Sequence, residues 1–254
     1  MDARRAALER LIDHAALFPP ASMSMADALA EDARVRAAET GWIVGRFVVP
    51  ASRVAELDGY DGALSVVLDA DLSPGDRRVE AVEVPPTASG DTVSRAQIPA
   101  RGDAAGASDT VSLEVYVERP LGDMSWLDEL NGGRAKVRCG GATTPSVDEL
   151  ASFVRRCREL GVVFKATAGL HHPVRRGDEH GFLNLLGACV FGFEEAVLAD
   201  DDPSAFKLTP ERFSWRGQGR GADEIARVRR ELFASFGSCS VQEPVDELRA
   251  IDVL

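Results

Sequence analysis

Short apolar runs that alternate with helical patterns are the dominant feature of this sequence of 254 residues. The runs are rich in β-branched and aromatic side chains, which is typical of strands. They lie at 42–49, 63–69, 79–84, 111–118, 135–139, 162–168, 212–216 and 236–240. Strands that alternate with helices form parallel sheets. Eight strand–helix units in a chain of this length predict an α/β fold, a closed (β/α)8 TIM barrel.

The segments between these runs predict helices at 3–16, 24–39, 51–57, 124–131, 146–160, 181–198, 222–235 and 244–252. The clearest helix begins after Ser146, a favourable N-cap with Glu149 three residues later, and ends before Gly161. We expect a single barrel domain with an N-terminal helical extension over 1–41 and a long mobile loop over 86–110. The main alternative is an open doubly wound sheet, which normally carries a glycine-rich turn after its first strand. "VVPASRVAEL" has no such turn.

Charged side chains fall on one face of several predicted strands. Successive side chains of a strand point to opposite sides, so Val137 and Ala166 lie on apolar faces while Lys136 and Lys165 lie on polar ones. The outer helices must pack on the apolar faces, and the polar faces are therefore expected to point into the barrel. The same alternation places these residues inside: Arg46, Asp69, Glu83, Glu114, Tyr116, Glu118, Arg138 and Thr167.

Lysine is rare here, which makes each lysine informative. The lysines are Lys136, Lys165 and Lys207, and the other 26 of the 29 basic residues are arginine. Arginine keeps its proton, whereas a lysine amine can lose it and act as a nucleophile or base. Adjacent strands lie about 4.8 Å apart, so Lys136 and Arg138 are expected to stand beside Lys165 and lower its pKa towards roughly 7 to 8. The alternative is an internal ion-pair network, for example between Glu114 and Lys136.

These considerations single out four candidate catalytic residues. Lys165 is expected to form a Schiff base or to act as a general base, with Lys136 beside it. Glu114 is expected on the inner face of a neighbouring strand. His171 follows the strand at 162–168, where the loops of a barrel form the catalytic face, and could act as an acid or base near neutral pH. A histidine that only organises this loop is the equal alternative.

The stretch "KATAGL" at 165–170 resembles the sixth-strand motif of the deoxyribose-phosphate aldolase group of class I aldolases. In that motif a small residue, a hydroxyl residue, another small residue and a glycine follow the Schiff-base lysine. The resemblance implies that Lys165 is this lysine and that Thr167 and Gly169 are its neighbours. The group carries a second lysine on the seventh strand, where this chain has "WRGQGRG". Lys136, on the predicted fifth strand, is the candidate replacement.

An anion site is expected where the last two predicted strands end. The stretches "WRGQGRG" (215–221) and "FGSCS" (236–240) lie there, and barrel loops at this place often bind phosphate through backbone N–H groups and a helix N-terminus. The expected substrate-binding residues are Arg138, Thr167, His172, Arg216, Arg220, Ser238 and Ser240. The segment "IDHAALFPPASMS" (12–24) is expected to plug the bottom of the barrel. A contribution of Asp13 or His14 to the active site is the alternative.

Composition and charge narrow the class of protein. The net charge of −12 argues against a surface for nucleic acid or anionic membrane, because both need clustered basic residues. No apolar run is long enough to span a membrane and no signal peptide is visible, so we expect a cytoplasmic protein. The four cysteines are widely spaced, which indicates reduced thiols. We expect neither cofactor nor metal, and a homo-oligomer is possible.

Three functions fit this sequence. The first, which we expect, is an enzyme of the aldolase or lyase type that acts on a small carbonyl compound bearing a carboxylate or phosphate. The second is a metal-assisted lyase or isomerase that uses Glu83, Glu114 and the histidines. The third is a barrel that binds an anion without chemistry. The sequence does not identify the substrate.

Overall fold

Eight parallel strands close into a barrel in the computed structural model, which describes residues 1–72, 77–86, 113–141 and 144–254. Around the barrel the order is β1, β2, β3, β4, β5, β6, β7 and β11, and β11 pairs back with β1. The strands are β1 (Ile12–His14), β2 (Val44–Pro50), β3 (Leu64–Val67), β4 (Val79–Val84), β5 (Glu114–Glu118), β6 (Arg134–Arg138), β7 (Phe164–Thr167) and β11 (Phe233–Ser238). The (β/α)8 architecture predicted from the alternating pattern is confirmed.

The prediction omitted one true barrel strand and included one segment that is not in the barrel, so the total of eight strands was still correct. Residues 12–14 form β1, the first barrel strand, although the sequence placed them in a helix and in a plug. The predicted seventh barrel strand at 212–216 instead lies in a separate antiparallel sheet of β8 (Phe206–Leu208), β9 (Phe213–Trp215) and β10 (Gln218–Arg220). Lys136 therefore stands on the sixth barrel strand and Lys165 on the seventh.

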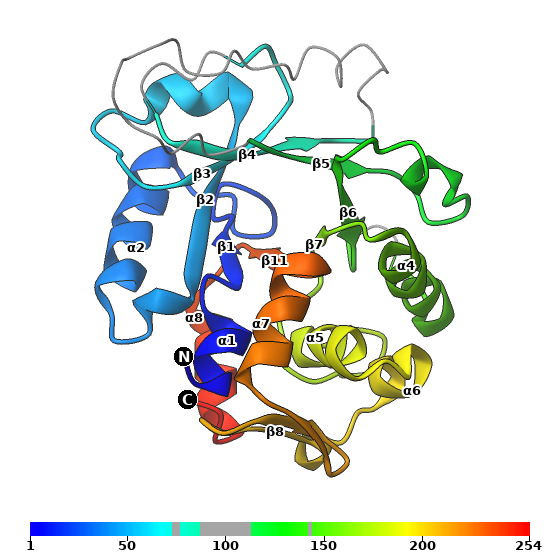
Figure 1. The fold of residues 1–254 in the computed structure, drawn as a ribbon. Helices are drawn as coiled ribbons and strands as arrows, with labels where there is room; N and C mark the ends of the chain where they lie inside the picture. Colours follow the sequence, from blue (N-terminus) through cyan, green and yellow to red (C-terminus); the bar gives the residue numbers. More distant parts are fainter. Residues whose placement is uncertain (73–76, 87–112, 142–143) are drawn as a thin grey trace, which may run out of the picture.

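The α-helices lie outside the barrel on the sides of β2, β6, β7 and β11, as Figure 1 shows. They are α1 (Ala3–Leu8), α2 (Met25–Ala37), α4 (Val147–Leu160), α5 (Phe182–Phe191), α6 (Glu194–Ala199), α7 (Ala222–Glu231) and α8 (Gln242–Ala250), with short 3-10 turns at Ala51–Glu56 and Ser125–Leu127. In α4 the capping box of Ser146 and Glu149 forms as predicted, and Gly161 ends the helix at φ 65°. The helix predicted at 181–198 divides at Gly192, where φ is 69°. No helix among the described residues is long and apolar enough to cross a membrane.

The outer faces of the strands form the main apolar core with the helices. Phe164 of β7 packs edge to face on Phe153 of α4, with ring centroids 5.1 Å apart. On the inner faces, Lys136 and Lys165 are buried, which confirms the orientation predicted from strand alternation. Asp69 is an exception, because it lies exposed beyond β3 and accepts hydrogen bonds from Ser52.

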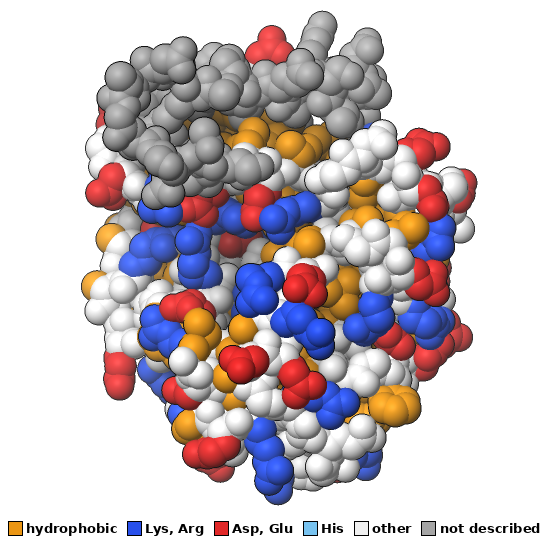
Figure 2. Space-filling model, in the orientation of Figure 1, with side chains coloured by type: hydrophobic (Ala, Val, Ile, Leu, Met, Phe, Trp, Pro, Cys, Tyr) orange, Lys and Arg blue, Asp and Glu red, His pale blue; other side chains and the backbone are white. Residues whose placement is uncertain are grey.

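The surface carries both signs of charge in spite of the net negative charge. On the face in Figure 2, basic side chains gather near α1 and α7.

The loop predicted over 86–110 lies outside the described residues, apart from residue 86.

Candidate active site

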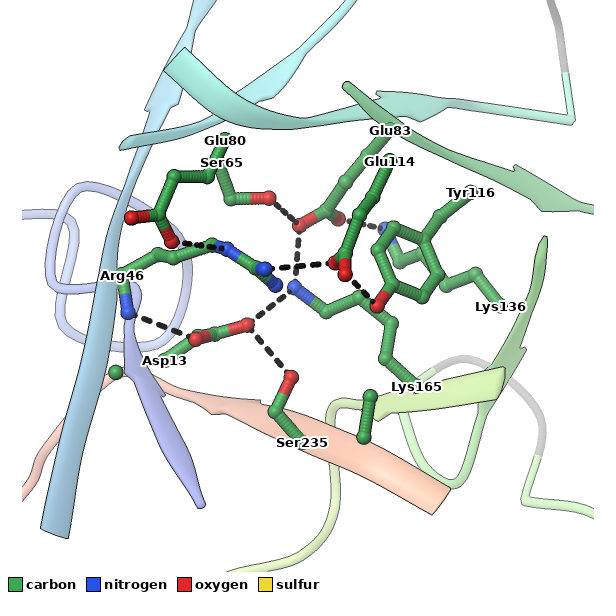
Figure 3. Close-up of polar contacts among 12 residues, drawn as sticks. Asp13, Arg46, Ser65, Glu80, Glu83, Glu114, Tyr116, Lys136, Lys165 and Ser235 are labelled. Atoms are coloured by element: carbon green, nitrogen blue, oxygen red, sulfur yellow. Dashed lines mark hydrogen bonds and ion pairs between the residues drawn. The ribbon is translucent and has the colours of Figure 1, made fainter. Parts of the chain in front are cut away.

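Two lysines stand side by side inside the barrel. Lys136 of β6 and Lys165 of β7 are register partners on neighbouring strands. Lys165 is 1% exposed and Lys136 is 5% exposed, so each ammonium group needs buried partners. Figure 3 shows the Lys165 amine between carboxylates that come from other strands.

Three carboxylates surround the lysine pair. Glu83 of β4 lies between the two amines, with its Oε1 2.6 Å from Lys165 Nζ and its Oε2 2.8 Å from Lys136 Nζ. Asp13 of β1 contacts Lys165 Nζ through Oδ2 at 2.7 Å, and Glu118 of β5 lies 2.9 Å from Lys136 Nζ. Glu118 also accepts a hydrogen bond from Arg138. Two buried lysines and three buried carboxylates, with the half-exposed Arg138 at the edge, therefore form one charge-balanced cluster.

Hydroxyl groups complete the hydrogen bonding of the carboxylates. Ser65 Oγ donates to Glu83 over 2.6 Å, and Ser235 Oγ donates to Asp13 over 2.8 Å. The backbone N–H of Arg46 donates to the other oxygen of Asp13. Hydrogen bonds to ionised carboxylates stabilise the charged form, so these contacts hold Asp13 and Glu83 as anions.

The expected lowering of the Lys165 pKa is wrong. Burial alone would lower the pKa of this amine, but attraction to Asp13 and Glu83 outweighs burial and raises the pKa above its ordinary value. Burial likewise would raise the pKa of Glu83, yet the two lysines hold it well below its usual range. The expected lowering rested on Lys136 and Arg138 as cationic neighbours, whereas the groups in contact with the Lys165 amine are the anions Asp13 and Glu83. Lys165 is therefore an ammonium group in the free protein.

A cavity of about 580 Å³ opens onto the lysine pair from the carboxyl ends of the strands. Its wall includes Arg138, Thr167, His171 and Ser238 among the predicted site residues. The same wall contains Phe18 and other residues that follow β1, so this N-terminal segment borders the mouth and does not plug the bottom.

Glycines bring the loops after β6 and β7 into close contact beside the cavity. Gly169 has φ 67°, and a side-chain Cβ there would lie 2.7 Å from the carbonyl oxygen of Cys139. A Cβ at Gly140 would lie 2.6 Å from the Cα of Gly169. Gly169 is therefore required by its positive φ and by backbone packing against the neighbouring loop.

The structure separates Glu114 from the other predicted catalytic residues. Glu114 opens β5, so it lies at the amino end of the barrel, where it pairs with Arg46 at 2.6 Å and Arg134 at 2.8 Å. It makes no ion pair with Lys136, which contacts Glu83 and Glu118 instead. The ion-pair network considered from the sequence thus exists with different partners.

The two histidines bind the loop after β7 to α8. His171 borders the cavity with Nδ1 3.5 Å from Glu243, and His172 lies 2.8 Å from Glu247 through Nδ1. His172 also approaches Glu179. The loop-organising role therefore describes His172, while His171 remains next to the cavity.

The predicted phosphate site is not assembled at the barrel mouth. Arg216 lies outside the barrel and pairs with Asp200 at 2.8 Å, and Arg220 lies 3.4 Å from Glu224 of α7. Ser238 ends β11 and donates to the carbonyl of Ser240, whose own hydroxyl accepts the N–H of Glu243 in α8. The two serines stay near the mouth, whereas the arginines left it because 212–216 is not a barrel strand.

Sequence reasoning missed or undervalued several members of the site. Asp13 was only an alternative, and Ser65 and Ser235 had no signal beyond their place in strands. Glu118 was placed inside by alternation but given no role. Among the described residues, no group of three or more His, Cys, Asp or Glu side chains is arranged to hold a metal ion.

Comparison of the chain with protein-family models, with curated proteins and with solved structures finds no match.

Proposed function

We propose that this barrel is an enzyme of the aldolase or lyase type, which cleaves or forms a C–C bond in a small anionic carbonyl compound through a lysine imine. The observation that carries the proposal is the pair of register-matched lysines buried in the cavity at the carboxyl ends of the strands. This end is where the active sites of barrel enzymes lie. The cavity thus gives a small molecule access to two amines with carboxylates beside them, and an amine with a base nearby can add to a carbonyl compound.

Lys136 is the better nucleophile of the two. The pKa of Lys165 is raised, and Asp13 and Glu83 keep its proton in place. Lys136 shares Glu83 with Lys165, but its second carboxylate is Glu118, which also binds the half-exposed Arg138 at the cavity mouth. Glu118 can therefore take the proton that Lys136 must lose before it attacks a carbonyl carbon.

The positions of the lysines agree with this division of roles. The resemblance of "KATAGL" to the aldolase group implied a Schiff-base lysine on the sixth strand and a second lysine on the seventh. With 12–14 counted as the first strand, Lys136 holds the sixth position and Lys165 the seventh. The motif itself then lies one strand later than the resemblance implied, and Lys165 takes the place of the second lysine.

The reaction would proceed in four balanced steps. The neutral amine of Lys136 adds to the substrate carbonyl, and Glu118 returns the proton it took from the ammonium to the departing hydroxyl, so that water leaves and a protonated imine remains. Glu118, again a carboxylate, removes the proton from a hydroxyl on the β carbon. The bond between the α and β carbons breaks, an aldehyde leaves, and the electron pair passes into an enamine. Glu118 gives that proton to the enamine carbon, and addition of water to the resulting protonated imine releases the second product and returns Lys136 as its ammonium form.

Arg138 is the residue best placed to bind the anionic group of the substrate. Its side chain is 48% exposed at the mouth and is anchored by a 2.9 Å contact to Glu118. A guanidinium can bind a carboxylate or phosphate through two parallel hydrogen bonds. Thr167, on β7 beside Lys165 and in the wall of the cavity, can donate to a substrate oxygen.

Borohydride reduction tests the proposal. A panel of small aldehydes and keto acids is incubated with the protein and reduced, and the intact mass is measured. We expect a stable adduct with at least one member and none without borohydride. Absence of any adduct, together with lyase or isomerase activity that a chelator abolishes, would replace this proposal with the metal-assisted function.

A further inference from the structure

A second cavity lies at the opposite, amino end of the barrel. It measures about 380 Å³ and does not include either lysine of the proposed active site. Its walls come from the start of the strands and from α7, and they consist of Arg10, Asp13, Gly45, Arg46, Glu114, Arg134, Arg229, Arg230, Ala234 and Ser235. Half of these residues are arginine, in a protein of net charge −12.

The arginines exceed the carboxylates available to neutralise them. Glu80 contacts Arg10, Arg46 and Arg78. Glu114 contacts Arg46 and Arg134. Asp13 is already paired with Lys165, the buried ammonium on its other side. Excess positive charge therefore remains at this end of the barrel, which is also where basic side chains gather near α1 and α7 in Figure 2.

Two arginines of α7 lie in this cavity without a carboxylate partner among the described residues. Arg229 donates only to backbone carbonyls, those of Ala7, Glu9, Phe233 and Ala234. Burial lowers the pKa of this guanidinium to about 10, so it still carries its charge at neutral pH. Arg230 is exposed and makes no ion pair within the described part of the chain. Arg229 fixes α7 in place, and Arg230 is left to contact a ligand.

We propose that this arginine-lined cavity, defined by Arg10, Arg46, Arg134, Arg229 and Arg230, is a binding site for a compact polyvalent phosphate. Guanidinium groups match phosphate oxygens in pairs, and several of them around one cavity favour an anion with more than one charge. The site is separate from the proposed active site, because the layer of Asp13, Lys165 and Glu83 lies between the two cavities. The inference is therefore independent of the proposed chemistry.

Isothermal titration with inorganic pyrophosphate at low ionic strength tests the proposal. We expect the wild type to bind and the double variant Arg134→Gln/Arg230→Gln to bind at least about tenfold more weakly, since each step of roughly 1.4 kcal/mol in binding is tenfold in Kd. The matched control is Arg227→Gln, which removes an exposed charge from the same helix but not from the cavity. A second control, Arg138→Gln, removes the arginine of the other cavity. Both controls should bind within about twofold of the wild type.

Three outcomes would overturn the proposal. The first is a wild type that does not bind millimolar pyrophosphate. The second is an Arg227→Gln variant that loses as much affinity as the double variant, because binding would then follow net charge alone. The third is a loss of affinity in Arg138→Gln with binding retained in the double variant, which would place the anion at the carboxyl end. Circular dichroism spectra of all variants establish that they are folded.

Discussion

The two ends of this barrel hold different kinds of charge. At the carboxyl end, the buried Lys136 and Lys165 and the half-exposed Arg138 are matched by Asp13, Glu83 and Glu118. At the amino end, arginines outnumber the carboxylates, and the exposed Arg230 of α7 borders the cavity. Lysine, which can lose its proton, stands at the proposed active site, and arginine, which keeps its charge, lines the proposed anion site.

Asp13 connects the two ends. One of its oxygens accepts the backbone N–H of Arg46, and the other contacts Lys165. The backbone of Arg46 at the amino end thus helps to position the carboxylate that pairs with Lys165, although the two cavities have no wall residue in common. Glu83 and Glu114 both lie on inner strand faces, but Glu83 lines the cavity at the carboxyl end and Glu114 the cavity at the amino end. The function of an ionised residue inside a barrel therefore depends on the end at which it lies.

The largest effect is expected from breaking the charge balance at the carboxyl end. Glu83→Gln removes the carboxylate that both lysines share, and two buried ammonium groups then compete for fewer anions. We expect a loss of about 3 kcal/mol in the free energy of unfolding, measured by urea titration. A variant as stable as the wild type would show that Glu83 does not hold the two lysines together.

Acid should weaken the carboxyl-end cluster before alkali does. The pKa values of Asp13 and Glu83 are lowered on folding, so their contribution is complete above their ordinary values of 3.8 and 4.5 and is lost as pH falls below them. The pKa of Lys165 is raised, so its contribution is complete below 10.5 and is lost only as pH rises beyond that value. Urea titrations should show a plateau between about pH 5 and 10.

The control for this pH dependence is Glu83→Gln. It lacks one of the two titrating carboxylates, so its stability should fall less between pH 7 and pH 4 than that of the wild type. Equal losses in the two proteins would assign the acid sensitivity to other groups.

A smaller effect is expected from the matching change at the amino end. Glu114→Gln removes a carboxylate that is 22% exposed and contacts Arg46 and Arg134. We expect at most about 1 kcal/mol loss in stability, because solvent screens this pair, and unchanged adduct formation in the borohydride assay. A strong loss of adduct in Glu114→Gln would return this residue to the active site.

The smallest effect concerns two cysteines in the wall of the carboxyl-end cavity. Cys139 is buried and its thiol pKa is raised by burial to about 12, whereas Cys239 is partly exposed. Iodoacetamide should label Cys239 slowly and leave Cys139 unlabelled in the folded protein, while both react after unfolding. Peptide mass spectrometry separates the two sites, and equal labelling of Cys139 would mean that the cavity is more open than the structure shows.

The barrel was predictable because most strands are long enough to show alternation, and Lys136 and Lys165 could be assigned to the inner face. The strand at 12–14 could not be predicted, because three residues are too few to show alternation and the neighbouring sequence has a helical pattern. The run at 212–216 was read correctly as a strand, but alternation does not reveal which sheet a strand joins.

For the candidate site, the sequence predicts which strand face a residue lies on, but it does not predict which residue will be its ion-pair partner. Alternation placed Lys165 inside, yet its partner Asp13 lies 152 residues away in the chain. The sign of the pKa shift depends on that partner, so the sequence argument took the wrong direction. Arg216 and Arg220 show the same limit, because their expected phosphate site depended on a strand order that the structure does not have.

The central claim is that the lysine pair forms an imine and that Lys136 is the attacking amine. Its most direct test is to map the borohydride-reduced adduct by peptide mass spectrometry in the wild type, Lys136→Arg and Lys165→Arg, with circular dichroism to establish folding. Both variants keep a positive charge at the substituted position. We predict an adduct on Lys136 in the wild type and in Lys165→Arg, and none in Lys136→Arg. An adduct on Lys165 that persists in Lys136→Arg would contradict the assignment of roles, and a wild type without any adduct would contradict the imine itself.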